Sequence, residues 1–371
     1  MKINAAVIDQ AGDDWDVREV ELLEHEIRPN EVLVEMQAAG LCHTDEHIRE
    51  GELPARYPFV GGHEGSGIAV AVGSEVTDIE PGDHVVLTFR PSCGLCHFCS
   101  EGRPNLCVKI RNVQQGDQHP RFLENEARIN AQSLLGTFAE FSVVPATSCV
   151  VVPKDIPFDV AALLGCAIPT GYGAAVHAGK VQSGDHCVVV GAGGVGMNAV
   201  QGAKVAGAAS IVVVDLSEQK QQIAMEYGAD AAVDSLQQVQ SYLETTQGIE
   251  HADVVILTVP VSKLANDALD ILKPGGRLVL AALGDPSNFR LDLPINRLVM
   301  NEITLRGTVM GSAALRRDIP RILVLYRQGK FKLNELITHR FSLQDIGKGY
   351  ETLHSGEMVR GVIDYSLNRA S

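Results

Sequence analysis

The sequence lacks an excess of positive charge. Its 31 Lys and Arg residues are outnumbered by 46 Asp and Glu residues, which gives a formal net charge of −15. Nucleic acid and anionic membranes repel a chain of this charge, so we expect neither as a partner. Residues Met1–Gln10 also lack the basic and apolar regions of a secretion signal. We therefore expect the protein to be cytoplasmic.

Long apolar runs are equally scarce. The uncharged stretch that is long enough to raise the question of a membrane helix, Val160–Gly179, is interrupted by Pro169 and by four glycines. These interruptions predict buried structure in a globular protein rather than a membrane span. The sequence also has no internal repeat and no low-complexity linker.

The length and a change of pattern along the chain predict two domains. A chain of 371 residues exceeds one ordinary hydrophobic core. The first half holds short β-branched segments between turn residues, which indicate a mainly β domain. These segments are Glu31–Gln37, Gly67–Val72 and His84–Thr88.

From about Pro169 onward, buried strands alternate with helical patterns. This alternation predicts an α/β fold in which helices cover both faces of a parallel sheet. The strand candidates are Cys187–Val190, Ser210–Val214, Val254–Val259, Arg277–Ala282 and Ile303–Met310. In the tail we expect helices over Asp318–Gln328 and Ser342–His354, the second capped by Ser342 with Asp345, and a strand over Arg360–Tyr365.

A glycine-rich turn follows the first of these strands directly. Residues Gly191–Gly196 read Gly-Ala-Gly-Gly-Val-Gly, the spacing of a dinucleotide-binding turn, although a plain tight turn is the alternative. Gly191 would allow the sharp turn and Gly193 the approach of backbone amides to a pyrophosphate, while Gly196 would let the helix pack closely. Gly194 and Val195 complete the turn.

An acidic residue supports the dinucleotide interpretation. Asp215 ends the second strand about 20 residues beyond the glycines, where it would accept the ribose hydroxyls and repel a 2′-phosphate. We therefore expect NAD rather than NADP. Lys220 either reaches the same ribose or belongs to a solvated helix face.

The cysteines are unevenly distributed. Four of the eight crowd into one segment, which in a reducing cytosol indicates metal binding more often than disulfides. Their spacing predicts a closed four-cysteine zinc site at Cys93, Cys96, Cys99 and Cys107. An iron–sulfur site is the alternative, but the fourth cysteine comes late and is followed by Val108, not proline. A nucleic-acid-binding zinc finger is disfavoured by the acidic composition.

Three further metal-ligand candidates lie far apart in the sequence. Cys42, His63 and Cys166 would each, taken alone, more often be a buried thiol or a satisfied histidine. Two of them stand in recognisable segments, Gly40–His47 and Gly62–Gly67, the latter continuing to Val76. On these motifs the chain resembles the medium-chain zinc alcohol dehydrogenases over essentially its whole length. It resembles their actinobacterial nicotinoprotein group, the nitrosoaniline-dependent enzymes, at Asp14–Asp16, Pro91–Gly94, Asn198–Gly202 and Asp318–Arg321.

The resemblance implies a fold and a division into domains. A GroES-like, β-rich catalytic domain would span residues 1–167, with a structural zinc lobe near residues 90–108. A Rossmann coenzyme domain with a doubly wound parallel sheet would span residues 168–310, and residues 311–371 would return to the catalytic domain. The long loop at residues 108–135, which includes Gln114–Asp117, is similar in length to that of dimeric members.

The resemblance also implies roles for single residues. Cys42, His63 and Cys166 would hold a reactive zinc with Glu64 close behind. Thr44 and His47 would form a proton relay, and His43 and Arg360 would contact the pyrophosphate. Thr170 would lie beside the nicotinamide. The substrate cleft or the nicotinamide site would be lined by Leu53, Phe89, Leu283 and Met310. Asp45 either orients His63 by accepting a hydrogen bond or serves as a cap or surface acid.

We therefore expect a zinc-dependent oxidoreductase that transfers a hydride between NAD and an alcohol, primary or small secondary, or its aldehyde. Two zinc ions per chain are implied, one catalytic and one structural. NAD is either exchanged, as in an ordinary aldehyde reductase, or retained and re-oxidised by a redox carrier. A homodimer, formed through the edge strand Ile303–Met310, is favoured over a tetramer.

Three other functions remain open. A formaldehyde dehydrogenase that acts on a thiol adduct is disfavoured by Leu53, because those relatives have an acidic residue there. A zinc-free quinone reductase would lack the metal ligands. A four-cysteine zinc interaction module with an idle nucleotide domain is the alternative from another class.

Overall fold

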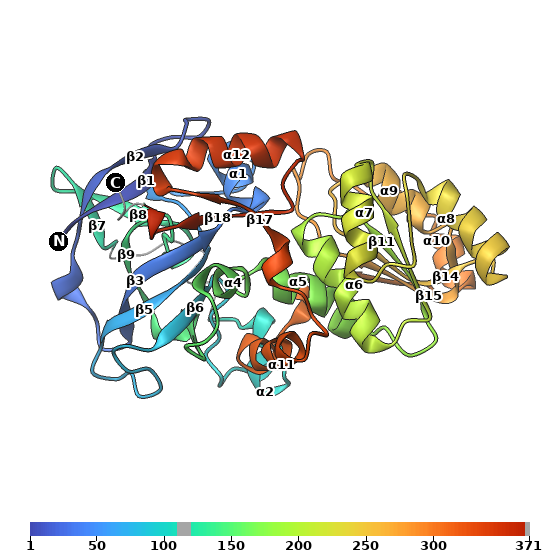
Figure 1. Ribbon diagram of the computed structural model, residues 1–371, viewed down its shortest axis with the longest axis horizontal. Helices are drawn as coiled ribbons and strands as arrows, with labels where there is room; N and C mark the ends of the chain where they lie inside the picture. Colours follow the sequence, from blue (N-terminus) through green and yellow to red (C-terminus); the bar gives the residue numbers. More distant parts are fainter. Residues whose placement is uncertain (110–119, 368–371) are drawn as a thin grey trace. The chain divides into compact units, whose positions relative to one another are not determined.

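The computed structural model describes residues 1–109 and 120–367, which divide into two compact units (Figure 1). Unit 1 comprises Met1–Cys166, Ala314–Pro320 and Leu333–Ser371, and unit 2 comprises Ala167–Ala313 and Arg321–Lys332. The helix α11 (Leu315–Arg327) therefore begins in unit 1 and ends in unit 2. The assignment of catalytic and coenzyme functions to separate domains stays a prediction.

Unit 1 contains a small closed barrel with the strand order β1, β2, β7, β8, β4. Its strands are β1 (Lys2–Ile8), β2 (Asp16–Leu22), β4 (Phe59–Val60), β7 (Phe122–Glu124) and β8 (Ala127–Ala131). The antiparallel pair β7 and β8 comes from the long loop at residues 108–135. Gln114–Asp117 of that loop lie outside the described residues.

A seven-stranded sheet forms the rest of the β structure in unit 1. Its path runs β10, β6, β5, β3, β18, β17, and β9 also pairs with β3. The strands are β3 (Glu31–Gly40), β5 (Glu64–Val72), β6 (His84–Thr88), β9 (Phe141–Pro145), β10 (Cys149–Val152), β17 (Ile337–Phe341) and β18 (Arg360–Asp364). Strand β3 is buried along nearly its whole length, with Glu35 and Gln37 half-buried.

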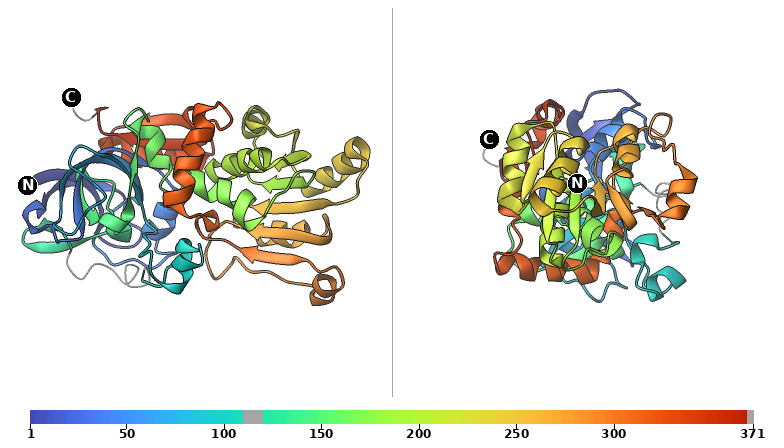
Figure 2. Two further views of the ribbon diagram at one scale, coloured as in Figure 1. Left: turned by 90° about the horizontal axis from the view of Figure 1, so that it is seen from below. Right: turned by 90° about the vertical axis from the view of Figure 1, so that its right-hand side faces the viewer.

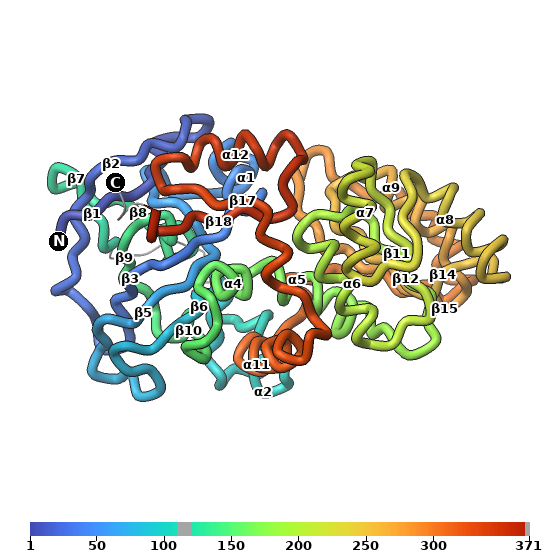
Figure 3. Tube along the Cα trace, in the orientation of Figure 1, coloured from blue at the N-terminus to red at the C-terminus, as the bar shows by residue number. Residues whose placement is uncertain are grey.

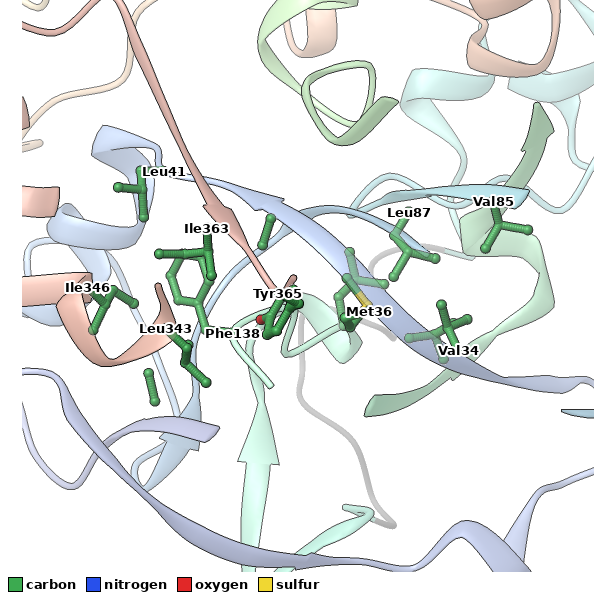
Figure 4. Packing of buried hydrophobic residues seen from close by; sticks show 14 of the residues in the cluster. Val34, Met36, Leu41, Val85, Leu87, Phe138, Leu343, Ile346, Ile363 and Tyr365 are labelled. Carbon is green, nitrogen blue, oxygen red and sulfur yellow. The ribbon is translucent and has the colours of Figure 1, made fainter. Parts of the chain in front are cut away.

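The C-terminal segment is part of the core of unit 1. Strand β18 pairs antiparallel with β3, so the red trace of β18 lies beside the blue trace of β3 in Figure 3. Met36 from β3 packs in one cluster with Phe138, Ile363 and Tyr365 (Figure 4). Each such fully buried side chain contributes roughly 1.5–3 kcal/mol of hydrophobic stabilisation. The tail is therefore held to the N-terminal strands by burial as well as by backbone pairing.

The helices of unit 1 are short. They are α1 (His43–Arg49), α2 (His97–Ser100), α4 (Phe158–Leu163) and α12 (Ile346–Ser355). Single 3₁₀ turns occur at Glu24–Glu26, Pro104–Leu106, Gln132–Leu134, Ala146–Ser148, Asn334–Leu336 and Leu343–Asp345.

Unit 2 is built on a six-stranded sheet with the order β13, β12, β11, β14, β15, β16, in which every neighbouring pair is parallel. The strands are β11 (His186–Val190), β12 (Ser210–Val214), β13 (Ala231–Val233), β14 (Ala252–Leu257), β15 (Leu272–Leu280) and β16 (Thr304–Gly307). Because the strand order reverses beside β11 and crossovers are right-handed, helices cover both faces of the sheet (Figure 2).

The helices of unit 2 connect these strands. They are α5 (Ala167–Gly173), α6 (Gly194–Ala206), α7 (Glu218–Tyr227), α8 (Leu236–Tyr242), α9 (Ser262–Ala268) and α10 (Ile295–Met300), with π-helical turns at Ala174–Ala178 and Leu243–Gln247 and a 3₁₀ turn at Met310–Ser312. The predicted α/β fold with a helix-covered parallel sheet is confirmed.

Several local predictions differ from the structure in detail. The short edge strand β13 was not predicted, because three half-buried residues carry almost no pattern. Helix α11 begins at Leu315, three residues before the predicted start, because Asp318 accepts the N–H of Ala314 at 2.8 Å. The predicted helix from Ser342 is a 3₁₀ turn followed by α12, and the Ser342 hydroxyl bonds the Asp345 carboxylate instead of the backbone.

The apolar stretch Val160–Gly179 is divided between α4, α5 and a π-helical turn, and nearly all of it is buried. Within residues 1–109 and 120–367, no helix combines the length and the apolar character that crossing a bilayer requires.

Candidate metal and cofactor sites

The strand register of unit 1 explains how Cys42 and His63 meet. Strands β3 and β5 pair antiparallel, with Ala39 opposite Gly65. The residues just after the end of β3 therefore lie beside the residues just before the start of β5. Cys42 is the residue before α1, and His63 directly precedes β5. A local sequence rule could not have predicted this proximity, because it depends on the pairing of two strands.

A glycine brings the third candidate ligand to the same place. Gly165 follows α4, and a Cβ atom at this position would lie 2.3 Å from the carbonyl oxygen of Leu87 in β6. Strand β6 pairs with β5, with Thr88 opposite Glu64. The close approach that Gly165 permits therefore places Cys166 at the end of the sheet where Cys42 and His63 lie.

The three side chains form one compact group with Glu64. Their ligand atoms all lie within 4.8 Å of one another. His63 is 1% exposed, and its Nε2 atom has no hydrogen-bond partner among the described residues. A buried imidazole nitrogen without a partner costs free energy unless something else binds it. Two thiols and one such nitrogen are a donor set that fits zinc.

The electrostatics of the two sulfur atoms favour a bound cation. The hydrogen bond from Cys166 lowers the pKa of the Cys42 thiol well below its usual range, and the same contact raises the pKa of Cys166. Burial opposes the charge of His63, but Asp45 and Cys42 raise its pKa above the usual range. The two thiols therefore hold one negative charge readily, and a divalent cation would stabilise the second thiolate.

Asp45 contacts both His63 and the start of α1. Its Oδ1 atom lies 2.6 Å from His63 Nδ1, and its Oδ2 atom accepts the backbone N–H of Cys42 at 3.2 Å. The carboxylate is fully buried. The two alternatives considered for this residue, a partner of His63 and a helix cap, are thus both present in the geometry.

Glu64 is held by the C-terminal strand. Its Oε2 atom lies 2.5 Å from Nη2 of Arg360 in β18, and its Oε1 atom lies 4.0 Å from His63 Nε2. Burial raises the pKa of Glu64 above its usual range, although Arg360 acts in the opposite direction and favours the carboxylate. Burial likewise opposes the charge of Arg360, but Glu64 keeps the pKa of Arg360 above its usual range. The expected pyrophosphate contact of Arg360 stays a prediction.

The remaining candidates of unit 1 lie on or near α1. His47 Nδ1 lies 2.5 Å from a carboxylate oxygen of Glu52, while Thr44 is half-buried and His43 exposed. Leu53 is half-buried, and its backbone N–H bonds His47 at 3.0 Å. The ring of Phe89 meets the imidazole of His63 edge-on, with centroids 5.0 Å apart. Phe89 therefore supplies an apolar wall beside the candidate ligand.

The four-cysteine segment folds into a second compact group. The distances between sulfur atoms are 3.5 Å for Cys96–Cys99, 3.8 Å for Cys96–Cys107 and 4.0 Å for Cys93–Cys99. A tetrahedron of sulfur atoms with bonds of about 2.3 Å to zinc has edges of about 3.8 Å. The donor set and the spacing therefore fit a closed zinc site.

Backbone N–H groups point at these sulfur atoms. The N–H groups of Leu95 and Cys96 lower the pKa of the Cys93 thiol, and those of Cys99 and Val108 lower the pKa of Cys96 to about 6. Burial raises the pKa of Cys99 to about 12. None of the eight cysteines, all of which lie in the described part of the chain, forms a disulfide.

The glycine-rich turn of unit 2 has an open cradle at the start of α6. Gly191 has φ +98°, and a Cβ atom at Gly196 would lie 1.8 Å from the carbonyl oxygen of Gly191, so neither position accepts a side chain. A Cβ atom at Gly193, in contrast, would meet no atom within 4 Å. A helix N-terminus that is left open in this way and has no side-chain cap fits a pyrophosphate.

Asp215 closes the turn from the end of β12. Its carboxylate accepts the N–H of Ala192 at 2.7 Å and the N–H of Ser217 at 2.9 Å. Gly194 and Val195 begin α6, and Lys220 lies half-buried on α7.

Three further predicted cofactor contacts also lie in unit 2. The Thr170 hydroxyl lies 3.7 Å from the sulfur of Met310, whereas Leu283 is 62% exposed. The cofactor roles of these residues stay predictions.

Comparison with known proteins identifies the family to which this chain belongs. Residues 28–154 match the alcohol dehydrogenase GroES-like domain, and residues 194–327 match the zinc-binding dehydrogenase family. The NDMA-dependent alcohol dehydrogenase of Amycolatopsis methanolica is 40% identical over 373 residues, covering 99% of this chain and 100% of the relative. This chain belongs to the medium-chain, zinc-binding alcohol dehydrogenase family.

Solved structures agree with this assignment. Benzyl alcohol dehydrogenase from Acinetobacter calcoaceticus matches with a TM-score of 0.88 and 29% identity, over 98% of this chain and 99% of that one. Acetophenone reductase from Geotrichum candidum, in complex with NAD, matches with a TM-score of 0.77 and 26% identity, over 98% and 97% of the two chains. The prediction of a zinc-dependent alcohol dehydrogenase with a GroES-like and a Rossmann part is confirmed.

Sequence reasoning missed three side chains of this alcohol dehydrogenase that support the His63 group. Gln132 and Tyr350 both bond the Asp45 carboxylate, and Trp15 stacks on Tyr350. A buried amide and a buried tyrosine carry no distinctive spacing, so they could not be found from the pattern. The available signal was Trp15 itself, the one tryptophan of the chain, within a segment that already resembled the nicotinoprotein group.

Proposed function

We propose that this alcohol dehydrogenase oxidises a primary or small secondary alcohol, or reduces the corresponding aldehyde, using zinc at Cys42, His63 and Cys166 and NAD at the glycine-rich turn. The observation that carries the proposal is the buried Nε2 atom of His63, which has no hydrogen-bond partner in the described chain and lies in one group with two thiols. Asp45 binds the opposite ring nitrogen and so directs the lone pair of Nε2 toward that group.

Bound at these residues, zinc would supply a Lewis acid that makes the hydroxyl group of the alcohol acidic enough to ionise near neutral pH. Asp45 keeps the proton of His63 on Nδ1, and Arg360 neutralises the Glu64 carboxylate next to the ligands. Phe89 presents an apolar edge beside His63, which favours an uncharged substrate.

The released proton would leave through α1. Thr44 and His47 are three positions apart on this helix and therefore share a face. The His47 side chain is 24% exposed and pairs with Glu52, which is 41% exposed. A proton passed from the Thr44 hydroxyl toward His47 would thus reach a pair of groups that meet the solvent.

NAD would supply the hydride acceptor, and unit 2 would bind it. The open position at Gly193 and the first N–H groups of α6 would take the pyrophosphate, with Gly191, Gly194, Val195 and Gly196 shaping the turn. Asp215 would accept the ribose hydroxyls, and Lys220 could add a cation on the same side. His43 and Arg360 remain the proposed pyrophosphate contacts, and Thr170, Leu283 and Met310 the proposed surroundings of the nicotinamide.

We extend the proposal to retention of NAD through turnover, with re-oxidation by a separate redox carrier. The support is the 40% identity to an alcohol dehydrogenase described as NDMA-dependent. The test is to denature the purified protein without added cofactor and to assay the released nucleotide. Stoichiometric NAD or NADH supports retention, and an empty site shows ordinary exchange.

The central test combines metal analysis with one variant. About two zinc ions per chain are expected, one in each cysteine-containing group. A single ion per chain would instead favour the zinc interaction module, and none would favour the quinone reductase. Cys166→Ser should fold, keep the ion of the four-cysteine group and lose alcohol oxidation. Alcohol oxidation retained by Cys166→Ser would rule out the proposed catalytic group.

A cytoplasmic location and a homodimer complete the proposal. The absence of disulfides among eight cysteines is typical of a reducing compartment. In unit 2, the edge strand β16 is close in sequence to exposed apolar residues of α10, namely Ile295, Val299 and Met300 at 62%, 67% and 81% exposure. Light scattering of the purified protein will show whether these surfaces pair two chains.

A further inference from the structure

The Asp45 carboxylate is surrounded by four hydrogen-bond donors. Its Oδ1 atom accepts from His63 Nδ1 and from Gln132 Nε2, each at 2.6 Å. Its Oδ2 atom accepts from the Tyr350 hydroxyl at 3.0 Å and from the Cys42 backbone at 3.2 Å. A fully buried carboxylate needs such a set, because its charge is costly to bury without donors. Two of these donors, Gln132 and Tyr350, have no place in the mechanism above.

The amide of Gln132 can bind in only one orientation. On one side it faces the Asp45 carboxylate, which only accepts hydrogen bonds. On the other side its Oε1 atom accepts the backbone N–H of Gly62 at 2.9 Å, and that N–H group only donates. Gln132 therefore links the Asp45 carboxylate to the backbone of Gly62, the residue before His63. One side chain thus holds both the carboxylate and the segment that carries the imidazole ring.

Tyr350 reaches Asp45 from the C-terminal part of the chain. It lies on α12, is 3% exposed, and donates its hydroxyl hydrogen to Oδ2. Its ring stacks on Trp15 with centroids 5.4 Å apart and an interplanar angle of 17°. The Trp15 ring also meets Phe138 edge-on at 5.4 Å. The hydroxyl position of Tyr350 is thus set by rigid packing from three separate segments.

We propose that Gln132 and Tyr350 are positioning residues for the catalytic metal, acting through Asp45 on His63. Gln132 and Tyr350 each bind one carboxylate oxygen and together prevent the carboxylate from turning away from His63 Nδ1. Asp45 would otherwise remain bonded to the Cys42 backbone as a helix cap, with its orientation toward His63 no longer fixed. This inference rests on the proposed metal group at Cys42, His63 and Cys166.

If Gln132 and Tyr350 act in this way, zinc should bind more tightly when both side chains are present than when either is lost. Loss of a side chain that orients a metal-ligating histidine typically weakens metal affinity by about 10- to 100-fold. Trp15 gives a second signal, because the chain has no other tryptophan and this ring touches Tyr350 directly. Uptake of zinc at the His63 group should therefore change the tryptophan fluorescence of the whole protein.

The experiment compares two variants with a matched control. Tyr350→Phe removes the hydroxyl but keeps the stacked ring, and Gln132→Glu keeps the shape but replaces the donor to Asp45 by a carboxylate oxygen. The control is Tyr365→Phe. Tyr365 is 2% exposed in the same core cluster as Tyr350, and its hydroxyl donates to the Thr137 carbonyl oxygen at 2.6 Å (Figure 4). The Tyr365→Phe substitution therefore removes one hydrogen bond of a buried tyrosine hydroxyl without affecting the contacts of Asp45.

The ion of interest is the zinc ion whose binding Cys166→Ser abolishes. Its dissociation constant is measured by chelator competition, and its binding is followed also by Trp15 fluorescence. Cobalt substitution adds the thiolate-to-metal absorption bands, which report ligand geometry independently of turnover. We expect zinc affinity to fall about 10-fold in Tyr350→Phe and up to about 100-fold in Gln132→Glu, with altered cobalt bands, and to stay within about twofold in Tyr365→Phe.

The outcomes separate this inference from the proposed function. If the wild-type protein binds no ion that Cys166→Ser abolishes, the proposed catalytic group fails. If it binds that ion, but Tyr350→Phe and Gln132→Glu hold it as tightly as Tyr365→Phe, only the positioning role is overturned. Should Tyr350→Phe fail to fold, the affinity and cobalt spectrum of Gln132→Glu decide the question, since this change adds no cavity.

Discussion

Arg360 and Glu64, 296 positions apart in the sequence, form a buried ion pair with 2.5 Å between Nη2 and Oε2. The two side chains are 6% and 0% exposed. They pack against Gly40, where a Cβ atom would lie 2.6 Å from the Glu64 oxygen. Two charges buried this deeply are tolerated as a pair, and each is costly without the other.

Arg360→Met should therefore destabilise the fold strongly. Removal of one partner of a buried pair costs about 3–5 kcal/mol, because the remaining charge is left uncompensated. Urea unfolding of the zinc-loaded protein measures this loss, and Glu64→Gln in the same chain should restore part of it. The control is Arg340→Met, which breaks the more exposed pair with Asp159 and should cost below about 1 kcal/mol. Equal losses in the two single variants would contradict the role of burial.

Gly165→Ala should release the zinc proposed at Cys42, His63 and Cys166. The added Cβ atom would lie 2.3 Å from the backbone oxygen of Leu87, so the segment that carries Cys166 must move away from β6. The expected result is loss of one zinc ion per chain and of alcohol oxidation, measured by metal analysis and assay. Gly347→Ala is the matched control, because a Cβ atom there meets nothing within 4 Å in α12. That control should be neutral or stabilising by up to about 1 kcal/mol. Full zinc content in Gly165→Ala would show that Cys166 is not held by this contact.

Asp215→Asn should weaken NAD binding and reduce the discrimination against NADP. A hydrogen bond to a charged group contributes about 1.5–3 kcal/mol, which corresponds to roughly 10- to 100-fold in affinity. Calorimetric titration of the nucleotide-free protein with both cofactors measures the change. Asp230→Asn provides the comparison, since Asp230 accepts the N–H of Ile211 elsewhere on β12. An unchanged ratio of NAD to NADP affinity in Asp215→Asn would remove Asp215 from the ribose site.

Cys149 and Cys187 should resist thiol reagents until the protein unfolds. Burial raises the pKa of each thiol to about 12, so almost no thiolate is present at about pH 8. Because the folded-state pKa values are raised, these thiols contribute stability below the unfolded pKa of about 8.5. That contribution is lost as the pH rises toward 12. Thiol titration of the zinc-loaded native protein, with peptide mapping of the label, tests this. All eight cysteines should react after denaturation with a chelator, and rapid native labelling of Cys149 or Cys187 would contradict the prediction.

Features encoded within short stretches could be predicted from the sequence. The four cysteines of the second group lie within one segment, and their spacing already indicates a shared metal. The glycine-rich turn likewise joins a strand to the helix that follows it, so its geometry depends on neighbouring residues only. Strands β11, β12, β14 and β15 were predicted because continuous apolar runs between turns are a local signal.

The proposed catalytic group could be predicted only through resemblance. The proximity of Cys42 and His63 depends on the register of β3 with β5, and that of Cys166 depends on the contact of Gly165 with Leu87. No periodicity within any one segment records such pairings, because strand register is set by long-range backbone bonding and burial.

The α/β class, the glycine-rich turn and the four-cysteine group follow from the sequence alone, because each depends on residues close together along the chain. The contacts of Gln132 and Tyr350 with Asp45, and the pairing of Arg360 with Glu64, become visible only once the chain has folded. Amide, phenol and guanidinium groups occur throughout any protein, and a buried carboxylate selects its donors only after distant segments have packed around it.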